Sequence, residues 1–167
     1  IPETIIGQIP PPTPTPPTFG AFLAPTENDT IAFDTFTATS GTFAASTSNG
    51  APLTFGISGG TAGSTVVEGE TFDVSQDGPF VTLFVNSANG DFTFVPDNDA
   101  INALTEPAAA NFTVTVSDGT LSADQTFTIA INGTNDAAVI SGDTSGSTVE
   151  AGSGGDVNIL SAPLTAT

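Results

Sequence analysis

Residues 111–132, NFTVTVSDGTLSADQTFTIAIN, decide the fold of this chain, because apolar and polar side chains alternate along both halves of the stretch. A period of two places one face of a strand in a core and leaves the other face in water. The apolar members of the alternation are Phe112, Val114, Val116, Phe127, Ile129 and Ile131. Asp118-Gly119 lies between the halves and is a typical hairpin turn. We therefore predict an antiparallel hairpin formed by residues 111–117 and 123–132.

Further strand patterns precede this hairpin. Residues 53–57 and 92–94 alternate in the same way. Residues 80–85 are largely apolar on both faces and predict a central strand or a strand covered by a loop. Asn89-Gly90 predicts a second hairpin turn, and residues 99–104 predict one short helical turn. Roughly seven strands over about 110 residues are typical of an antiparallel β-sandwich. The predicted core residues are Phe33, Phe43, Leu53, Phe55, Ile57, Val81, Leu83, Phe92, Phe94, Leu104, Phe112, Val114, Val116, Phe127, Ile129 and Ile131.

Composition divides the chain into three parts. Residues 1–17 hold seven of the 13 prolines, which favour extended polyproline II, so residues 1–25 are predicted to form an arm. Residues 26–140 are predicted to form the sandwich. Residues 141–167 are either the start of a further repeat or a strand donated to a neighbouring copy. The apolar residues at the two ends that are candidates for assembly contacts are Ile5, Ile6, Ile9, Val139, Ile140, Val149, Val157, Ile159 and Leu160. The arm itself is interpreted as either a stiff spacer or a docking segment.

The charge of the chain excludes several classes of partner. The 167 residues contain 18 Asp and Glu but no Lys, Arg or His, which gives a net charge of −18. Such a chain cannot neutralise nucleic-acid phosphates, and it is repelled by anionic membrane surfaces. The chain has no Cys nucleophile and no His or Lys that could activate a Ser, so we expect no enzyme activity. The hydrophobic content of 38% and the 13 Phe residues favour a folded domain, which we expect to be extracellular.

Several short motifs of residues 89–140 occur in an order that resembles a VCBS repeat, a cadherin-like module of large bacterial surface adhesins. These motifs are GDFTFVPDN (90–98), AINAL (100–104), VSDGT (116–120) and GTNDA (133–137). Residues 41–60 resemble the early strands of the same family. The resemblance implies an Ig-like (cadherin-like) sandwich located outside the cell or on the surface of a bacterium.

Calcium is the metal ion that suits these side chains best, because its ligands are carboxylate, amide and carbonyl oxygens. The resemblance implies calcium between consecutive modules. It implies the ligand positions Glu27, Asp97, Asp99, Asp118, Asn135 and Asp136. The chain departs from the family at residues 46–51, STSNGA, where the family commonly has aspartates. Each of these carboxylates is also interpretable as a solvated turn cap, and for Asp118 that interpretation is favoured.

Two functions follow from the sequence as hypotheses. The first is a non-enzymatic structural protein that joins identical subunits head-to-tail by strand exchange into an extracellular fibre or surface layer. The second is an adhesin repeat, stiffened by calcium, that binds a cell-surface or carbohydrate ligand. The two hypotheses differ in whether the terminal segments are structurally ordered. A polymer needs both termini ordered in contact with neighbouring subunits, whereas an adhesin repeat would have a free, flexible arm.

Overall fold

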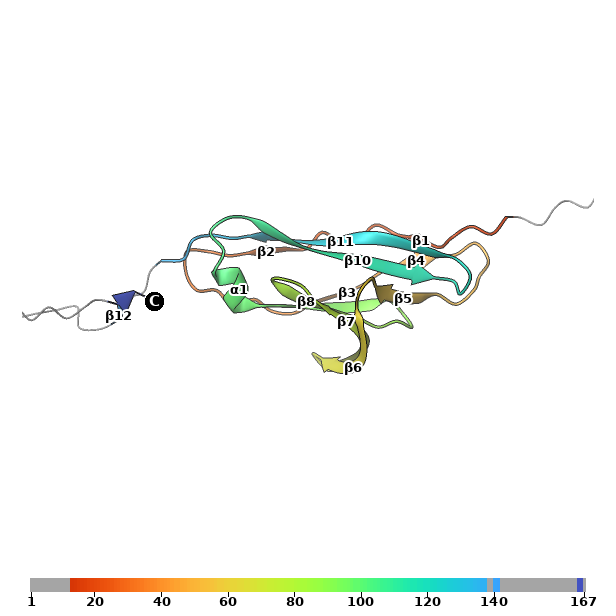
Figure 1. The fold of residues 1–167 in the computed structure, drawn as a ribbon, viewed down its shortest axis with the longest axis horizontal. Coiled ribbons are helices and arrows are strands. Elements are labelled where there is room, and N and C mark those ends of the chain that lie inside the picture. Colours follow the sequence, from red (N-terminus) through yellow and green to blue (C-terminus); the bar gives the residue numbers. More distant parts are fainter. Residues whose placement is uncertain (1–12, 138–139, 142–164, 167) are drawn as a thin grey trace, which may run out of the picture.

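The computed structural model describes residues 13–137, 140–141 and 165–166, and its body is an all-β sandwich of two packed sheets (Figure 1). The strands are β1 (Thr18–Phe19), β2 (Thr26–Asn28), β3 (Thr39–Thr42), β4 (Ala45–Ser46), β5 (Thr54–Ile57), β6 (Thr61–Val67), β7 (Glu70–Asp77), β8 (Val81–Val85), β9 (Asp91–Pro96), β10 (Ala108–Ser117), β11 (Ser122–Asn132), β12 (Ile140–Ser141) and β13 (Thr165–Ala166). Helix α1 spans Asn98–Asn102. The two main sheets have the orders β2-β11-β10-β5 and β3-β9-β8-β7-β6, and β1 pairs with β4.

The predicted hairpin is confirmed as β10 and β11. Phe112 lies opposite Phe127 in the antiparallel register, and the alternate residues of both strands are buried as the sequence predicts. Gly119 in the turn has φ 86°, a left-handed conformation that glycine adopts without strain. The second hairpin joins β8 and β9, where Gly90 has φ 79°. Strand β8 lies between β7 and β9, as expected for a central strand.

The core lies between the two main sheets. Residues of β8 and β9 in one sheet and of β5, β10 and β11 in the other form a single buried cluster. Most of the predicted core residues belong to it, while Leu53 packs against it only partly buried and Leu104 is half-buried. The sequence analysis missed Phe72, Val85 and Ile101, which are all fully buried. Ile101 belongs to α1, and its side chain is buried. The short helix closes one end of the sandwich (Figure 1).

The prediction for Phe33 is wrong, because its side chain is 69% exposed. Ile31 and Phe33 follow a spacing of two that suggests a strand, yet residues 29–38 between β2 and β3 form no strand. Polar contacts with α1 hold this segment instead, since the Phe36 amide donates to Asn98 Oδ1 at 2.8 Å. Without a ladder of strand bonds, the spacing of two does not place either side chain against the sheet.

Part of the predicted arm belongs to the sandwich. Strand β1 pairs antiparallel with β4, with Thr18 opposite Ser46. The Phe22 ring lies 4.9 Å from the ring of Phe43, centroid to centroid, and Phe19 packs against the same core. The sandwich therefore begins at Thr18 rather than at residue 26.

Most of the candidate assembly residues lie outside the described residues. These are Ile5, Ile6, Ile9, Val139, Val149, Val157, Ile159 and Leu160. Ile140 is described only by its backbone, which belongs to β12. This strand pairs antiparallel with β13 of the same chain, with Ile140 opposite Ala166.

Candidate functional site

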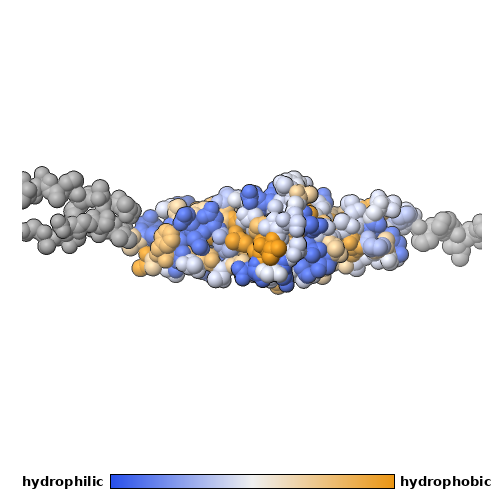
Figure 2. Space-filling view, turned by 90° about the horizontal axis from the view of Figure 1, so that it is seen from below, coloured by the Kyte–Doolittle hydropathy of each residue, from blue (hydrophilic) through white to orange (hydrophobic). Residues whose placement is uncertain are grey.

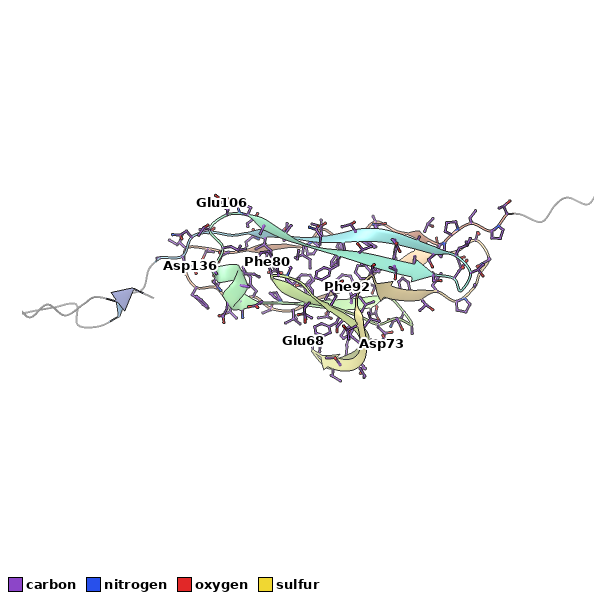
Figure 3. All side chains as sticks on the ribbon, in the orientation of Figure 1. Glu68, Asp73, Phe80, Phe92, Glu106 and Asp136 are labelled. Atoms are coloured by element: carbon purple, nitrogen blue, oxygen red, sulfur yellow. The ribbon has the colours of Figure 1, made fainter. Side chains whose placement is uncertain are left out.

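The described chain enters the sandwich at one end and leaves it at the other (Figure 1). We call these ends the N-pole, formed by Thr13 and the loops 46–51 and 118–121, and the C-pole, formed by residues 29–36, α1 and residues 133–137. In Figure 3, Asp136 and Glu106 are labelled at the C-pole. Most of the predicted calcium ligands belong to the C-pole or its border.

Strand pairing builds the C-pole. Strand β2 runs parallel to β11, so residue 29 emerges beside the end of β11. The Asp29 amide donates to the Asn132 carbonyl at 3.2 Å, and the Thr134 amide donates to Asp29 Oδ2 at 2.9 Å. These bonds hold the start of the 29–36 loop against the segment through which the chain leaves.

Helix α1 fixes the other end of the same loop. Asn102 is buried, and its side chain accepts from the Asp34 amide at 2.6 Å and donates to the Asp34 carbonyl at 2.9 Å. The Thr30 amide donates to Asp34 Oδ2 at 2.5 Å, which closes the loop on itself. The carboxylates of Asp29 and Asp34 are therefore held by backbone anchors at both ends of the loop.

The charges of Asp29 and Asp34 act on the carboxyl of Asp136 at this pole. Asp29 is only 6% exposed, and the Oδ1 atoms of Asp29 and Asp136 are both buried with no hydrogen-bond donor. Loss of hydration raises the pKa of Asp136, and the charges of Asp29 and Asp34 raise it further. The chain has no cationic side chain that could offset this repulsion.

Other carboxylates of the sandwich are satisfied by neutral donors. Asp91 accepts from the Thr42 hydroxyl at 2.6 Å and from the Asn89 amide at 2.6 Å. Asp77 accepts from the Thr82 hydroxyl at 2.8 Å. Hydroxyl and amide groups therefore donate to these carboxylates, as Lys and Arg do in most proteins. The Oδ1 atoms of Asp29 and Asp136 at the C-pole differ, because they are buried and accept no hydrogen bond.

The predicted calcium ligands are only partly brought together. Asp97 caps α1, where its Oδ1 accepts from the Ala100 amide at 3.1 Å, and Asp99 is exposed in the first turn of that helix. Asn135 is exposed beside Asp136. Glu27 lies on β2, where burial raises the pKa of its carboxyl. Within the described part of the chain, no three acidic groups lie close enough to hold a metal ion in this arrangement.

Sequence analysis missed Asp29 and Asp34 as members of the C-pole. Their signal was indirect, because Asp29 directly follows a strand that pairs with the last long strand, and that pairing brings it beside residues 132–134. The register between β2 and β11 is long-range, and no local pattern reveals it. Carboxylate, amide and backbone oxygens at this pole are the ligand types that calcium prefers.

Asp118 belongs to the opposite pole and acts as a turn cap. Its carboxylate accepts from the Leu121 amide at 2.8 Å, the Thr120 amide at 2.9 Å and the Asn49 side chain at 3.0 Å. These donors lower the pKa of Asp118, with the Leu121 and Thr120 amides contributing most. Asn49 belongs to the loop 46–51, where VCBS repeats commonly have aspartates. In this chain the side-chain amide of Asn49 donates to Asp118 instead.

A shallow cavity at the N-pole is lined by Thr13, Pro14, Ser48, Asn49 and Thr120. Its lining carries hydroxyl and amide groups but no charged side chain, so it offers hydrogen bonds rather than charge to a ligand.

Among the described residues, no helix has both the length and the apolar character needed to cross a membrane. Comparisons with protein-family models, with curated proteins and with solved structures found no match to this chain.

Proposed function

We propose that this chain is a non-enzymatic, extracellular structural module whose sandwiches join identical subunits head-to-tail into a fibre or surface layer. The observation that carries the proposal is the placement of the two poles at opposite ends of an elongated body (Figure 1). A contact between the C-pole of one copy and the N-pole of the next is heterologous, so it propagates along one axis. The VCBS-like, cadherin-like motifs of residues 89–140 support the same use, because they resemble modules of bacterial surface proteins.

Strand exchange is the proposed form of this contact. The donor is the C-terminal tail, because residues 139–164 carry apolar side chains with the spacing of strands, or else the proline-rich arm, in which Ile5, Ile6 and Ile9 form an apolar face. Among the described residues, each main sheet ends in strands that pair with another strand on one side only, β2 and β5 in one sheet and β3 and β6 in the other. The outer edge of β5 is partly occupied, because the Phe55 amide donates to the Ser87 carbonyl at 2.9 Å. An unpaired edge accepts a further strand through backbone hydrogen bonds.

Assembly of the full chain and of a truncated chain tests this proposal. Deleting residues 141–167 should leave a folded monomer that no longer forms fibres, as measured by sedimentation velocity and negative-stain imaging. Added salt should promote assembly of the full chain, because it screens the repulsion between subunits with a charge of −18. A full chain that stays monomeric at high concentration and high salt would disprove head-to-tail assembly, and fibres of the truncated chain would disprove donation by the tail.

The second candidate function is a calcium-stiffened adhesin repeat that binds a cell-surface or carbohydrate ligand. It is favoured by the bare, buried Oδ1 atoms of Asp29 and Asp136 beside Asp34. A bound cation would offset the charge at this pole. Asp29, Asp34 and Asp136 would be the residues that hold it, and their carboxylates would have to move closer together around it than they lie in the described arrangement.

The substitution Asp136→Asn separates the two states of this pole by the sign of its effect. Without calcium, the substitution removes a carboxylate whose pKa is raised, so the variant should melt at a higher temperature than the wild type at neutral pH. With calcium, the variant loses a ligand and should melt lower than the wild type. Asp124→Asn, on the exposed side of β11, is the matched control. An increase that is the same with calcium and with chelator would exclude calcium at the C-pole.

A further inference from the structure

Two large apolar side chains stand exposed at the C-pole. Among the described residues, the large apolar side chains that are most exposed are Leu23, Ile31, Phe33 and Val66, at 66% to 69%. Ile31 and Phe33 share the 29–36 loop, and Figure 2 shows apolar surface at the end of the body beside the C-terminal segment. The Ala137 amide donates to the Ile31 carbonyl at 3.0 Å, so this apolar pair adjoins the point where the chain leaves the sandwich.

The loop presents this pair in a fixed position. Asn98 and Asn102 of α1 bond its backbone on one side, and Thr134 bonds Asp29 on the other. These hydrogen bonds hold the backbone of the loop in one conformation, and Ile31 and Phe33 are exposed in that conformation. An exposed aromatic and an exposed aliphatic side chain, two residues apart on a loop whose backbone is anchored, are surface of the kind that binds partners.

The charge of the C-pole restricts what can cover the pair. Asp29, Asp34 and Asp136 repel any acidic surface, and the chain carries 18 acidic residues in total. Residues 1–26 contain only one of these, Glu3, whereas residues 138–167 at the other end of the chain contain three. The same segment carries Ile5, Ile6, Ile9 and a run of prolines, and extended proline-rich segments bind surfaces formed by aromatic rings.

We propose that Ile31 and Phe33 bind the N-terminal segment, residues 1–12, of a second copy of this chain. The proposal rests on the proposed head-to-tail assembly and adds to its strand exchange a second contact surface, because residues 29–38 form no strand. Docking apolar side chains and prolines on the pair removes exposed apolar area from water while bringing only one additional carboxylate to the acidic pole.

Distance favours a second copy over the same copy. The segment leaves the body at the N-pole, and twelve residues of polyproline II span about 37 Å. Strand β11 alone, with 11 residues, is about 36 Å long and runs between the two poles. A segment folded back on its own sandwich would use its whole length to reach the C-pole, whereas a segment facing the C-pole of a neighbour has that length available for contacts.

The test uses a labelled synthetic peptide of residues 1–12 and the full chain. Fluorescence anisotropy should show saturable binding, and Phe33→Ser and Ile31→Ser should each weaken it about tenfold. Val66→Ser and Leu23→Ser remove equally exposed apolar side chains elsewhere and should change binding less than twofold. An excess of unlabelled peptide should shorten the fibres of the wild-type chain.

The outcomes separate this inference from the proposed function. If the full chain forms fibres that Phe33→Ser leaves unchanged and the peptide binds both equally, the docking surface is wrong while head-to-tail assembly stands. If Phe33→Ser lowers the melting temperature without changing peptide binding, the chain's own residues 138–164 cover the pair and the inference is overturned. If Val66→Ser weakens peptide binding as much as Phe33→Ser, the contact is unspecific and the inference fails. If the full chain forms no fibres but the peptide binds through Phe33, the docking surface survives and the proposed function does not.

Discussion

Replacing Phe127 with alanine should remove a large part of the stability of this sandwich. The ring is fully buried on β11, and its centroid lies 5.1 Å from the rings of Phe43 and Phe92 and 6.0 Å from that of Phe22. Truncation of a buried Phe to Ala costs about 3–5 kcal/mol. That cost already includes lost aromatic pairs, each worth about 0.5–1.5 kcal/mol beyond the buried area. Because Phe127 makes several such pairs, we expect Phe127→Ala to lie in the upper half of the range, at about 4–5 kcal/mol.

Phe33→Ala is the matched control, because it makes the same chemical change at a residue with 69% exposure. Its effect should stay within about 0.5 kcal/mol. Urea titration followed by far-ultraviolet circular dichroism measures both variants, since the chain has no Trp or Tyr for fluorescence. For a slope of about 2 kcal/mol per molar urea, the midpoint of Phe127→Ala should fall by about 2 M. A loss below about 2 kcal/mol for Phe127→Ala, or an equal loss for Phe33→Ala, would refute this account of the core.

Three further predictions concern the N-pole, a turn and the arm. The pKa of Asp118 is lowered in the folded chain, so its contribution to stability is present above the ordinary value of 3.8 and is lost as pH falls below it. Asp118→Asn should therefore lower the melting temperature at neutral pH but hardly at about pH 2, and an equal effect at both would contradict this role. Gly90→Ala should destabilise by about 2–4 kcal/mol in urea titrations, because φ is 79° and a Cβ would lie 2.8 Å from the Phe43 carbonyl oxygen. Gly119→Ala, with φ 86° and open space, should cost only about 1 kcal/mol, and equal losses would show that the close approach is unimportant. Phe22→Ala should cost about 2–3 kcal/mol by the same titration, whereas an unchanged midpoint would mean that the arm does not stabilise the sandwich.

The sequence predicted the β10–β11 hairpin well because local physics decides it. Alternation with a period of two needs only neighbouring residues, and Asp118-Gly119 supplies the one backbone conformation that the turn requires. The same reasoning failed at Phe33, where the spacing was right but no partner strand was present. Whether an alternating pair enters a sheet depends on long-range pairing, which the spacing does not contain.

The C-pole shows the same limit. Asp136 was predicted from a motif, whereas Asp29 and Asp34 belong to the pole only because β2 pairs with β11 and Asn102 reaches the backbone of residue 34. Such contacts join residues far apart in sequence. The burial of Asn102 could not be predicted from the sequence either. An asparagine in a short helix is as easily solvated as buried, and only its hydrogen bonds to the backbone of residue 34 distinguish the two.

The parallel pair of β2 and β11 has a mechanical consequence. Its register joins Thr26 to Ala130, Glu27 to Ile131 and Asn28 to Asn132, and both strands run toward the C-pole. Tension on a fibre pulls the N-terminal strand back toward the N-pole and the C-terminal strand outward, so the backbone bonds between them are loaded in shear and together. A shear load must break these bonds at once, whereas a hairpin pulled open from its end loses them one by one. The module should therefore resist stretching along the axis on which it is proposed to assemble, because the force is borne where β2 and β11 meet.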